Sequence, residues 1–149
     1  MHYSPILAPV VALVAWSLIV MLWMAAARGK QFRRLGVNLS NIPPGSRGVD
    51  LEGRAEPTAQ WKSHNYNHLM EQPTIFYAIA LALALMGNGG GINYWLAWGY
   101  VGFRIVHSLV QCTINIVRIR FTLFALASLC LIGLTTHAAL RIAHDCGLL

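Results

Sequence analysis

The chain has 149 residues, of which 56% are hydrophobic and 11% are charged, and its formal net charge is +6. This composition excludes an ordinary soluble domain of the same size and is typical of an integral membrane protein. The positive charge does not indicate nucleic-acid binding, because the basic residues concentrate in the connections between apolar segments. We expect a single membrane domain over residues 1–149.

Apolar segments follow one another along the chain, and each fits the helix of about 20 residues that spans a membrane. The first, from Pro5 to Ala27, contains no charged residue. The third contains Arg104 and His107, and the fourth has His137 as the only ionisable residue in its core over 121–140. The fold class predicted is therefore an all-α bundle of four transmembrane helices, over residues 5–27, 60–87, 92–114 and 118–144.

The connections differ sharply in charge. The first, over residues 28–59, is long and rich in glycine and proline, and it and its borders hold the basic residues Arg28, Lys30, Arg33, Arg34, Arg47, Arg54 and Lys62. Arg118 and Arg120 lie beside the third connection, whereas the second, GNGGG, has no basic residue. Because basic residues near span ends favour the cytoplasm, we expect the first and third connections to be cytoplasmic. Both termini would then be periplasmic in a bacterial inner membrane.

The second predicted helix begins with the polar stretch WKSHNYNHLMEQP before it becomes apolar. His64, His68 and Glu71 share one helical face, because they occupy positions i, i+4 and i+7, and Asn67 neighbours Glu71. Pro73 removes a backbone donor and is expected to kink the helix, which releases a main-chain carbonyl about one turn earlier.

The third predicted helix carries a second polar stripe, Arg104, His107 and Gln111, at positions i, i+3 and i+7. An ionisable residue at membrane depth is costly unless it is paired or hydrated. We therefore expect the two polar stripes to face each other, or a neighbouring subunit, around a hydrated pocket in the cytoplasmic half of the bundle, where Glu71 could meet Arg104. Two structural alternatives stay open: the pair is a buried bridge that only fixes helix register, or the polar head of the second helix is only solvated.

A metal site is a further alternative. His64, His68, Glu71 and His107 offer imidazole and carboxylate ligands of the kind that hold iron or zinc in helical bundles. The nearby arginines oppose a bound cation, so no metal ligands are predicted. A metal or quinone redox protein remains an alternative function.

At these residues the sequence resembles the MAPEG family, the membrane-associated proteins in eicosanoid and glutathione metabolism, and its bacterial members in particular. The second helix of that family carries the pattern Arg-x-x-x-Asn-x-x-Glu, followed by a proline and an aromatic residue. In the same register this chain has His64, His68 and Glu71, followed by Pro73 and Phe76. The glutamate, proline and aromatic residue match, whereas histidines replace the arginine and the asparagine.

The third-helix motif of the family, Arg-x-x-Tyr/His, matches Arg104 and His107. The family also has an arginine at the start of the fourth helix that stabilises a glutathione thiolate. In this chain it falls on Arg118 or Arg120, and the spacing from Arg104 slightly favours Arg118.

The resemblance implies a homotrimer that binds glutathione, as the thiol co-substrate, between protomers near the cytoplasmic face. A lipophilic substrate would enter from the membrane lipid. The residues that would bind glutathione are Glu71, Arg104, His107, His64, His68, Asn67 and Gln111. The function implied is that of a glutathione-dependent transferase or peroxidase. The alternative from the same fold is an accessory or ligand-binding subunit of a larger membrane complex, without glutathione chemistry.

Overall fold

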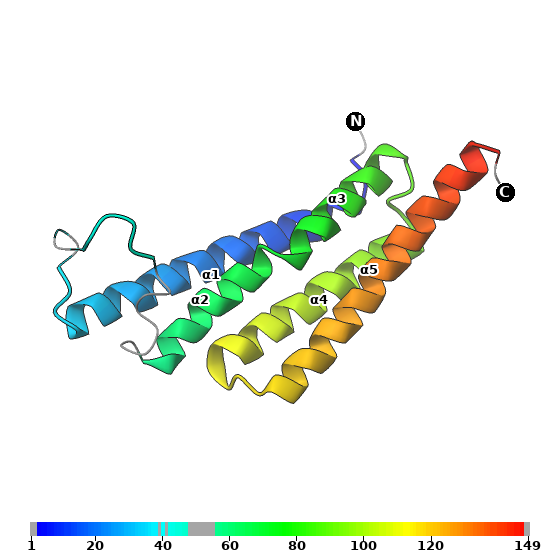
Figure 1. Cartoon of the computed structure of the whole chain (residues 1–149). Helices are drawn as coiled ribbons and strands as arrows, with labels where there is room; N and C mark the ends of the chain where they lie inside the picture. Colours follow the sequence, from blue (N-terminus) through cyan, green and yellow to red (C-terminus); the bar gives the residue numbers. More distant parts are fainter. Residues whose placement is uncertain (1–2, 39, 41, 48–55, 148–149) are drawn as a thin grey trace.

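The computed structural model describes residues 3–38, 40, 42–47 and 56–147. Long helices dominate these residues and lie side by side, as Figure 1 shows. The bounds of the helices are α1 Leu7–Arg34, α2 Pro57–Leu69, α3 Gln72–Leu85, α4 Ile92–Thr113 and α5 Val117–Asp145. The predicted all-α bundle is confirmed, with α2 and α3 together forming the second of its rods.

The start of α1, the α3–α4 turn and the end of α5 lie at one end of the bundle (Figure 1). The α4–α5 turn and the end of α1 lie at the opposite end. Gly89 in the α3–α4 turn packs tightly on the chain before α1, because a Cβ added there would lie 2.1 Å from Ser4 Oγ and 2.6 Å from Ile6 Cγ2. The first and last described helices therefore begin and end at the same end of the bundle, whereas the membrane face to which the termini belong stays a prediction. Which face is cytoplasmic stays a prediction.

Helix α1 continues to Arg34, although the sequence predicted that it ends near Ala27. Contacts with α2 explain the extra turns: Arg28 Nε donates to Ser63 Oγ at 3.0 Å, and Arg34 pairs with Glu56. These contacts stabilise a polar stretch that apolar patterning alone would not assign to the helix. Residues 48–55 of the predicted connection, which include Arg54, lie outside the described residues.

The bundle is apolar both inside and outside. Within the described residues, three helical segments are long and apolar enough to cross a membrane: α1, α5 and the α2–α3 rod. Helix α4 has 22 residues, which corresponds to about 33 Å and matches the thickness of a bilayer core. It is less apolar because it carries polar side chains, and these are largely turned towards the other helices, as at Asn93, Arg104, His107, Ser108 and Gln111.

Candidate active site

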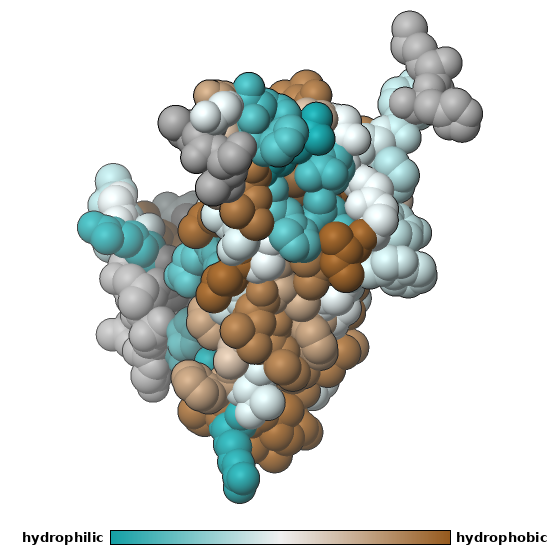
Figure 2. Space-filling view, turned by 90° about the vertical axis from the view of Figure 1, so that its right-hand side faces the viewer, coloured by the Kyte–Doolittle hydropathy of each residue, from teal (hydrophilic) through white to brown (hydrophobic). Residues whose placement is uncertain are grey.

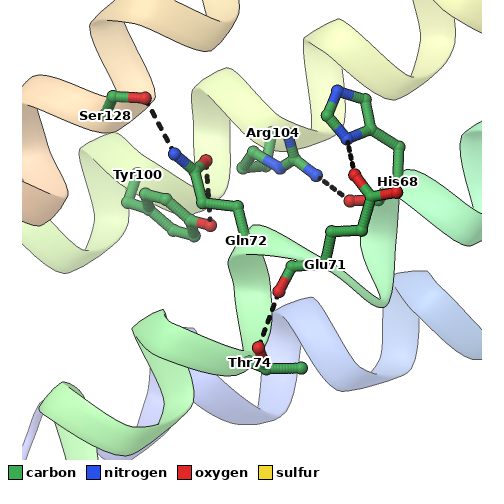
Figure 3. Close-up of polar contacts among 7 residues, drawn as sticks. All are labelled: His68, Glu71, Gln72, Thr74, Tyr100, Arg104 and Ser128. Atoms are coloured by element: carbon green, nitrogen blue, oxygen red, sulfur yellow. Dashed lines mark hydrogen bonds and ion pairs between the residues drawn. The ribbon is translucent and has the colours of Figure 1, made fainter.

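The second rod of the bundle is broken between Leu69, where α2 ends, and Gln72, where α3 begins. Pro73 has no N–H group to donate to the carbonyl of Leu69, so the regular helix cannot continue undisturbed. Beside the break, the carbonyl of His68 accepts a hydrogen bond of 2.6 Å from Nη2 of Arg104 (Figure 3). The predicted kink at Pro73 is confirmed, and an arginine of α4 uses a main-chain carbonyl beside it.

The polar stripe of α4 faces the interior of the bundle, as predicted. Arg104 is 1% exposed, His107 is 2% exposed and Gln111 is 4% exposed. Nε and Nη1 of Arg104 have no hydrogen-bond partner among the described residues. Arg104 is therefore a cation that is withdrawn from solvent with only part of its hydrogen-bonding capacity used, which favours negative charge nearby.

The side chain of Glu71 does not supply that negative charge directly. Its carboxylate lies 3.0 Å from Nδ1 of His68, and the side chain is 68% exposed (Figure 3). Among the described residues, Glu71 and Arg104 form no direct ion pair, so the prediction that they pair within one chain is wrong, whereas the alternative that they face a neighbouring subunit stays a prediction. The physical reason is the helix break, since Glu71 stands before α3 with a non-helical backbone and turns outward. His68 links the two residues, through its ring to Glu71 and through its carbonyl to Arg104.

A pocket of about 280 Å³ lies beside the break, between α2, α4 and α5. Its polar lining comes from His68, His107 and Arg120, and its apolar lining comes from Val117, Phe121 and Phe124. The ring of His68 stacks on Phe124 with centroids 5.5 Å apart and meets His107 edge-on at 5.2 Å. These contacts fix a cationic and imidazole-lined surface against an apolar wall.

The α4–α5 turn determines which arginine reaches the pocket. Asn115 in this turn has a φ of 52°, a left-handed conformation that asparagine tolerates better than most residues. Its side-chain Oδ1 accepts a hydrogen bond from Nη1 of Arg120 at 2.5 Å. Arg118 is exposed and does not line the pocket. Of the two arginines, only Arg120 lines this pocket, and which of them activates a thiol stays a prediction.

The sequence model of the MAPEG family matches this chain over residues 6–140. The chain belongs to the MAPEG family. No curated protein and no solved structure matches it. The family match covers the helix break, the α4 stripe and the α4–α5 turn, so the resemblance drawn from the second and third helices is confirmed. The relation to bacterial members in particular stays a prediction.

In this MAPEG chain, only part of the predicted site residues gather at the pocket. His68 and His107 line it, and Arg104 lies directly behind His68. His64 and Asn67 are exposed on α2 and do not line the pocket, whereas Gln111 is buried but also not part of the lining.

Sequence reasoning missed the most deeply buried polar residue of α2. Asn65 is 1% exposed, and its Nδ2 donates a hydrogen bond to Ser108 of α4. It lies one residue from His64, which corresponds to a rotation of about 100° around the helix. The sequence shows that α2 has a polar head, but the rotation of that head is set by packing against α4.

A second polar network joins the break to α4 and α5. Gln72 donates from Nε2 to Ser128 Oγ at 2.8 Å and accepts from the hydroxyl of Tyr100 at 3.4 Å (Figure 3). No sequence signal other than the polarity of Gln72 pointed to this network. Among the described residues, no group of three or more His, Cys, Asp or Glu side chains is placed to hold a metal ion, so the structure adds no support to the metal alternative.

Proposed function

We propose that this MAPEG protein is a glutathione-dependent transferase or peroxidase that acts on a lipophilic substrate. The observation that carries the proposal is the pocket in which Arg120, His68 and His107 face the apolar side chains of α5. Membership of the MAPEG family supports the same assignment, because the family resemblance implies glutathione chemistry.

The charge balance around the pocket favours an anionic ligand. Arg104 is buried and Arg120 lines the pocket, so two guanidinium groups lie on the same side of the bundle. The nearby carboxylate of Glu71 is largely exposed and paired with His68. Glutathione carries two carboxylates and, after ionisation, a thiolate, and guanidinium groups bind carboxylates by charge-assisted hydrogen bonds.

Arg120 is the residue that we assign to thiol activation. A thiol becomes a good nucleophile only as the thiolate, and a neighbouring cation favours that form. A guanidinium about 4 Å from the sulfur contributes roughly 1–4 kcal/mol to the thiolate, depending on the local dielectric. This corresponds to lowering the pKa of the glutathione thiol by about one to three units.

The apolar wall of the pocket suits a substrate dissolved in the membrane. Val117 and Phe121 are each 71% exposed at the start of α5, where a hydrocarbon chain can contact them. In the transferase reaction, the thiolate sulfur forms a bond to an electrophilic carbon of this substrate, and the leaving group departs with its bonding electrons. The protein's part is to bind the two reactants, hold the sulfur as an anion and keep both near the membrane surface.

We place the site near the cytoplasmic face, because it lies at the end of the bundle that carries the basic connections. We also propose that the protein is a homotrimer, as its family resemblance implies. The pocket lies at the edge of a single protomer, with exposed residues in its wall, which leaves room for a neighbouring copy to complete it.

A conjugation assay with glutathione and a hydrophobic electrophile tests the function. Arg120→Gln is expected to lower kcat/KM by roughly tenfold to thousandfold, the loss that corresponds to the thiolate stabilisation above. Arg118→Gln removes the same charge two residues away, outside the pocket, and is expected to change kcat/KM by less than about threefold. Wild-type protein that conjugates no electrophile and reduces no hydroperoxide would favour the accessory-subunit alternative.

A further inference from the structure

A second pocket, of about 330 Å³, lies at the other end of the bundle. It is formed by the α3–α4 turn, the start of α4 and the last turns of α5, and its lining residues are Asn88, Ile92, Asn93, His137, Leu140 and Arg141. His137 lies about 25 Å along α5 from Arg120, so this pocket is separate from the candidate active site.

Hydrogen bonds fix the tautomer of the histidine in this pocket. Asn93 is 2% exposed, and its Nδ2 donates to the carbonyl of Asn88 at 2.8 Å. Its Oδ1 therefore faces Nδ1 of His137 at 2.7 Å, and as an acceptor it requires the proton to be on Nδ1. In the neutral ring this leaves Nε2 as a hydrogen-bond acceptor, and it has no partner among the described residues.

Arg141 places a cation one turn further along α5. Its Nε donates to Asp145 at 3.0 Å, and the side chain is 50% exposed. A guanidinium has five N–H donors, so this pair leaves donors on Arg141 for a further anion. The pocket thus combines a cation with an acceptor nitrogen in one small space.

The rim of the pocket is apolar. Ile92 is 60% exposed and Leu140 is 51% exposed, at the ends of helices whose outer surfaces are apolar. Figure 2 looks onto this end of the molecule and shows hydrophilic residues gathered above a broad hydrophobic surface. A ligand with a polar head and a hydrocarbon tail matches this combination, since it covers the rim as well as the polar groups.

We propose that this pocket binds a membrane phospholipid through its headgroup. The phosphate pairs with Arg141, and an N–H or O–H group of the headgroup donates to Nε2 of His137. Phosphatidylethanolamine and phosphatidylglycerol carry such a donor, whereas the quaternary ammonium of phosphatidylcholine does not. A soluble phosphate ester shares the anionic chemistry but leaves Ile92 and Leu140 uncovered.

Native mass spectrometry of the purified full chain in detergent, with each lipid titrated separately, tests the proposal. We expect phosphatidylethanolamine and phosphatidylglycerol to bind about tenfold more tightly than phosphatidylcholine. Arg141→Gln is expected to weaken binding of the first two by about tenfold, a typical effect of losing one charge-assisted contact. The matched control, Arg33→Gln, removes an exposed arginine at the opposite end of the bundle and is expected to leave binding at this site unchanged.

The comparison of lipids, the two arginine variants and competition by glycerol phosphate each test a different part of the proposal. Equal binding of all three lipids would overturn the assignment of the headgroup donor to His137. Equal weakening by Arg141→Gln and Arg33→Gln would overturn the site itself and indicate general attraction of lipid to basic protein. Glycerol phosphate that displaces the lipid at similar concentrations would overturn the lipid source and show a site for soluble phosphate esters.

Discussion

At the scale of single residues, Asn115 joins the backbone of the α4–α5 turn to the pocket. Its left-handed backbone ends α4, with its N–H donating to the carbonyl of Val110 at 2.7 Å, and its side chain holds Arg120. The two roles are separable by mutation, because glycine also accepts a positive φ but has no side chain to bind Arg120.

Asn115→Gly is therefore expected to leave the thermal unfolding temperature nearly unchanged and to release Arg120. The apparent pKa of the thiol of bound glutathione should rise, because the guanidinium spends less time near the sulfur. As a result, kcat/KM should fall by about threefold to tenfold. Asn115→Asp keeps the oxygen acceptor but adds a negative charge against the guanidinium, so it is expected to hold Arg120 in place and still raise the pKa of the thiol. A glycine variant with an unaltered thiol pKa would show that Asn115 has no positioning role.

At the scale of elements, the α3–α4 turn packs on the segment before α1 through Gly89. Gly89→Ala would place a methyl group 2.6 Å from Cγ2 and 3.2 Å from Cβ of Ile6, which is fully buried. Because Ile6 has no space to move, we expect a loss of about 1–3 kcal/mol in stability, measured by thermal unfolding in detergent. Gly90→Ala is the matched control, since a Cβ there meets nothing within 4 Å. Similar losses in both variants would contradict the close packing described.

The sequence predicted the breaks and buried faces of helices correctly wherever a single local pattern determines them. Pro73 predicted the break in the second rod, and the spacing of Arg104, His107 and Gln111 predicted the buried face of α4, because apolar surroundings on that helix left one polar side. Apolar patterning failed at the end of α1, where contacts from Arg28 and Arg34 to α2 extend the helix.

The candidate site was predictable only in part, because it depends on helix rotation and on turn geometry. The sequence showed that α2 has a polar head, but not that Asn65 points inward and His64 outward. The sequence offered two arginines near the start of α5, Arg118 and Arg120. Only Arg120 lines the pocket, where it donates a hydrogen bond to Asn115, and residue spacing does not reveal this contact.

At the scale of the whole molecule, the arrangement of the helices makes the topology testable. The α3–α4 turn lies at the end opposite the basic connections, so it is expected to be periplasmic. A membrane-impermeant thiol reagent added from outside should label Gly90→Cys in a Cys146→Ser background, since Cys146 is itself exposed at this end. Ser46→Cys, in the basic connection, should stay unlabelled until the membrane is permeabilised. The reverse labelling pattern would contradict the proposed orientation.

In the function proposed above, this bundle binds glutathione and holds it as a thiolate beside Arg120. The most direct measurement is the ultraviolet absorbance of the thiolate when glutathione is added to the purified protein at neutral pH. We expect a thiolate signal in the wild type and in Arg118→Gln, and its loss in Arg120→Gln while glutathione remains bound. Wild-type protein that binds glutathione without forming the thiolate, or an Arg120→Gln signal equal to that of the wild type, would contradict it.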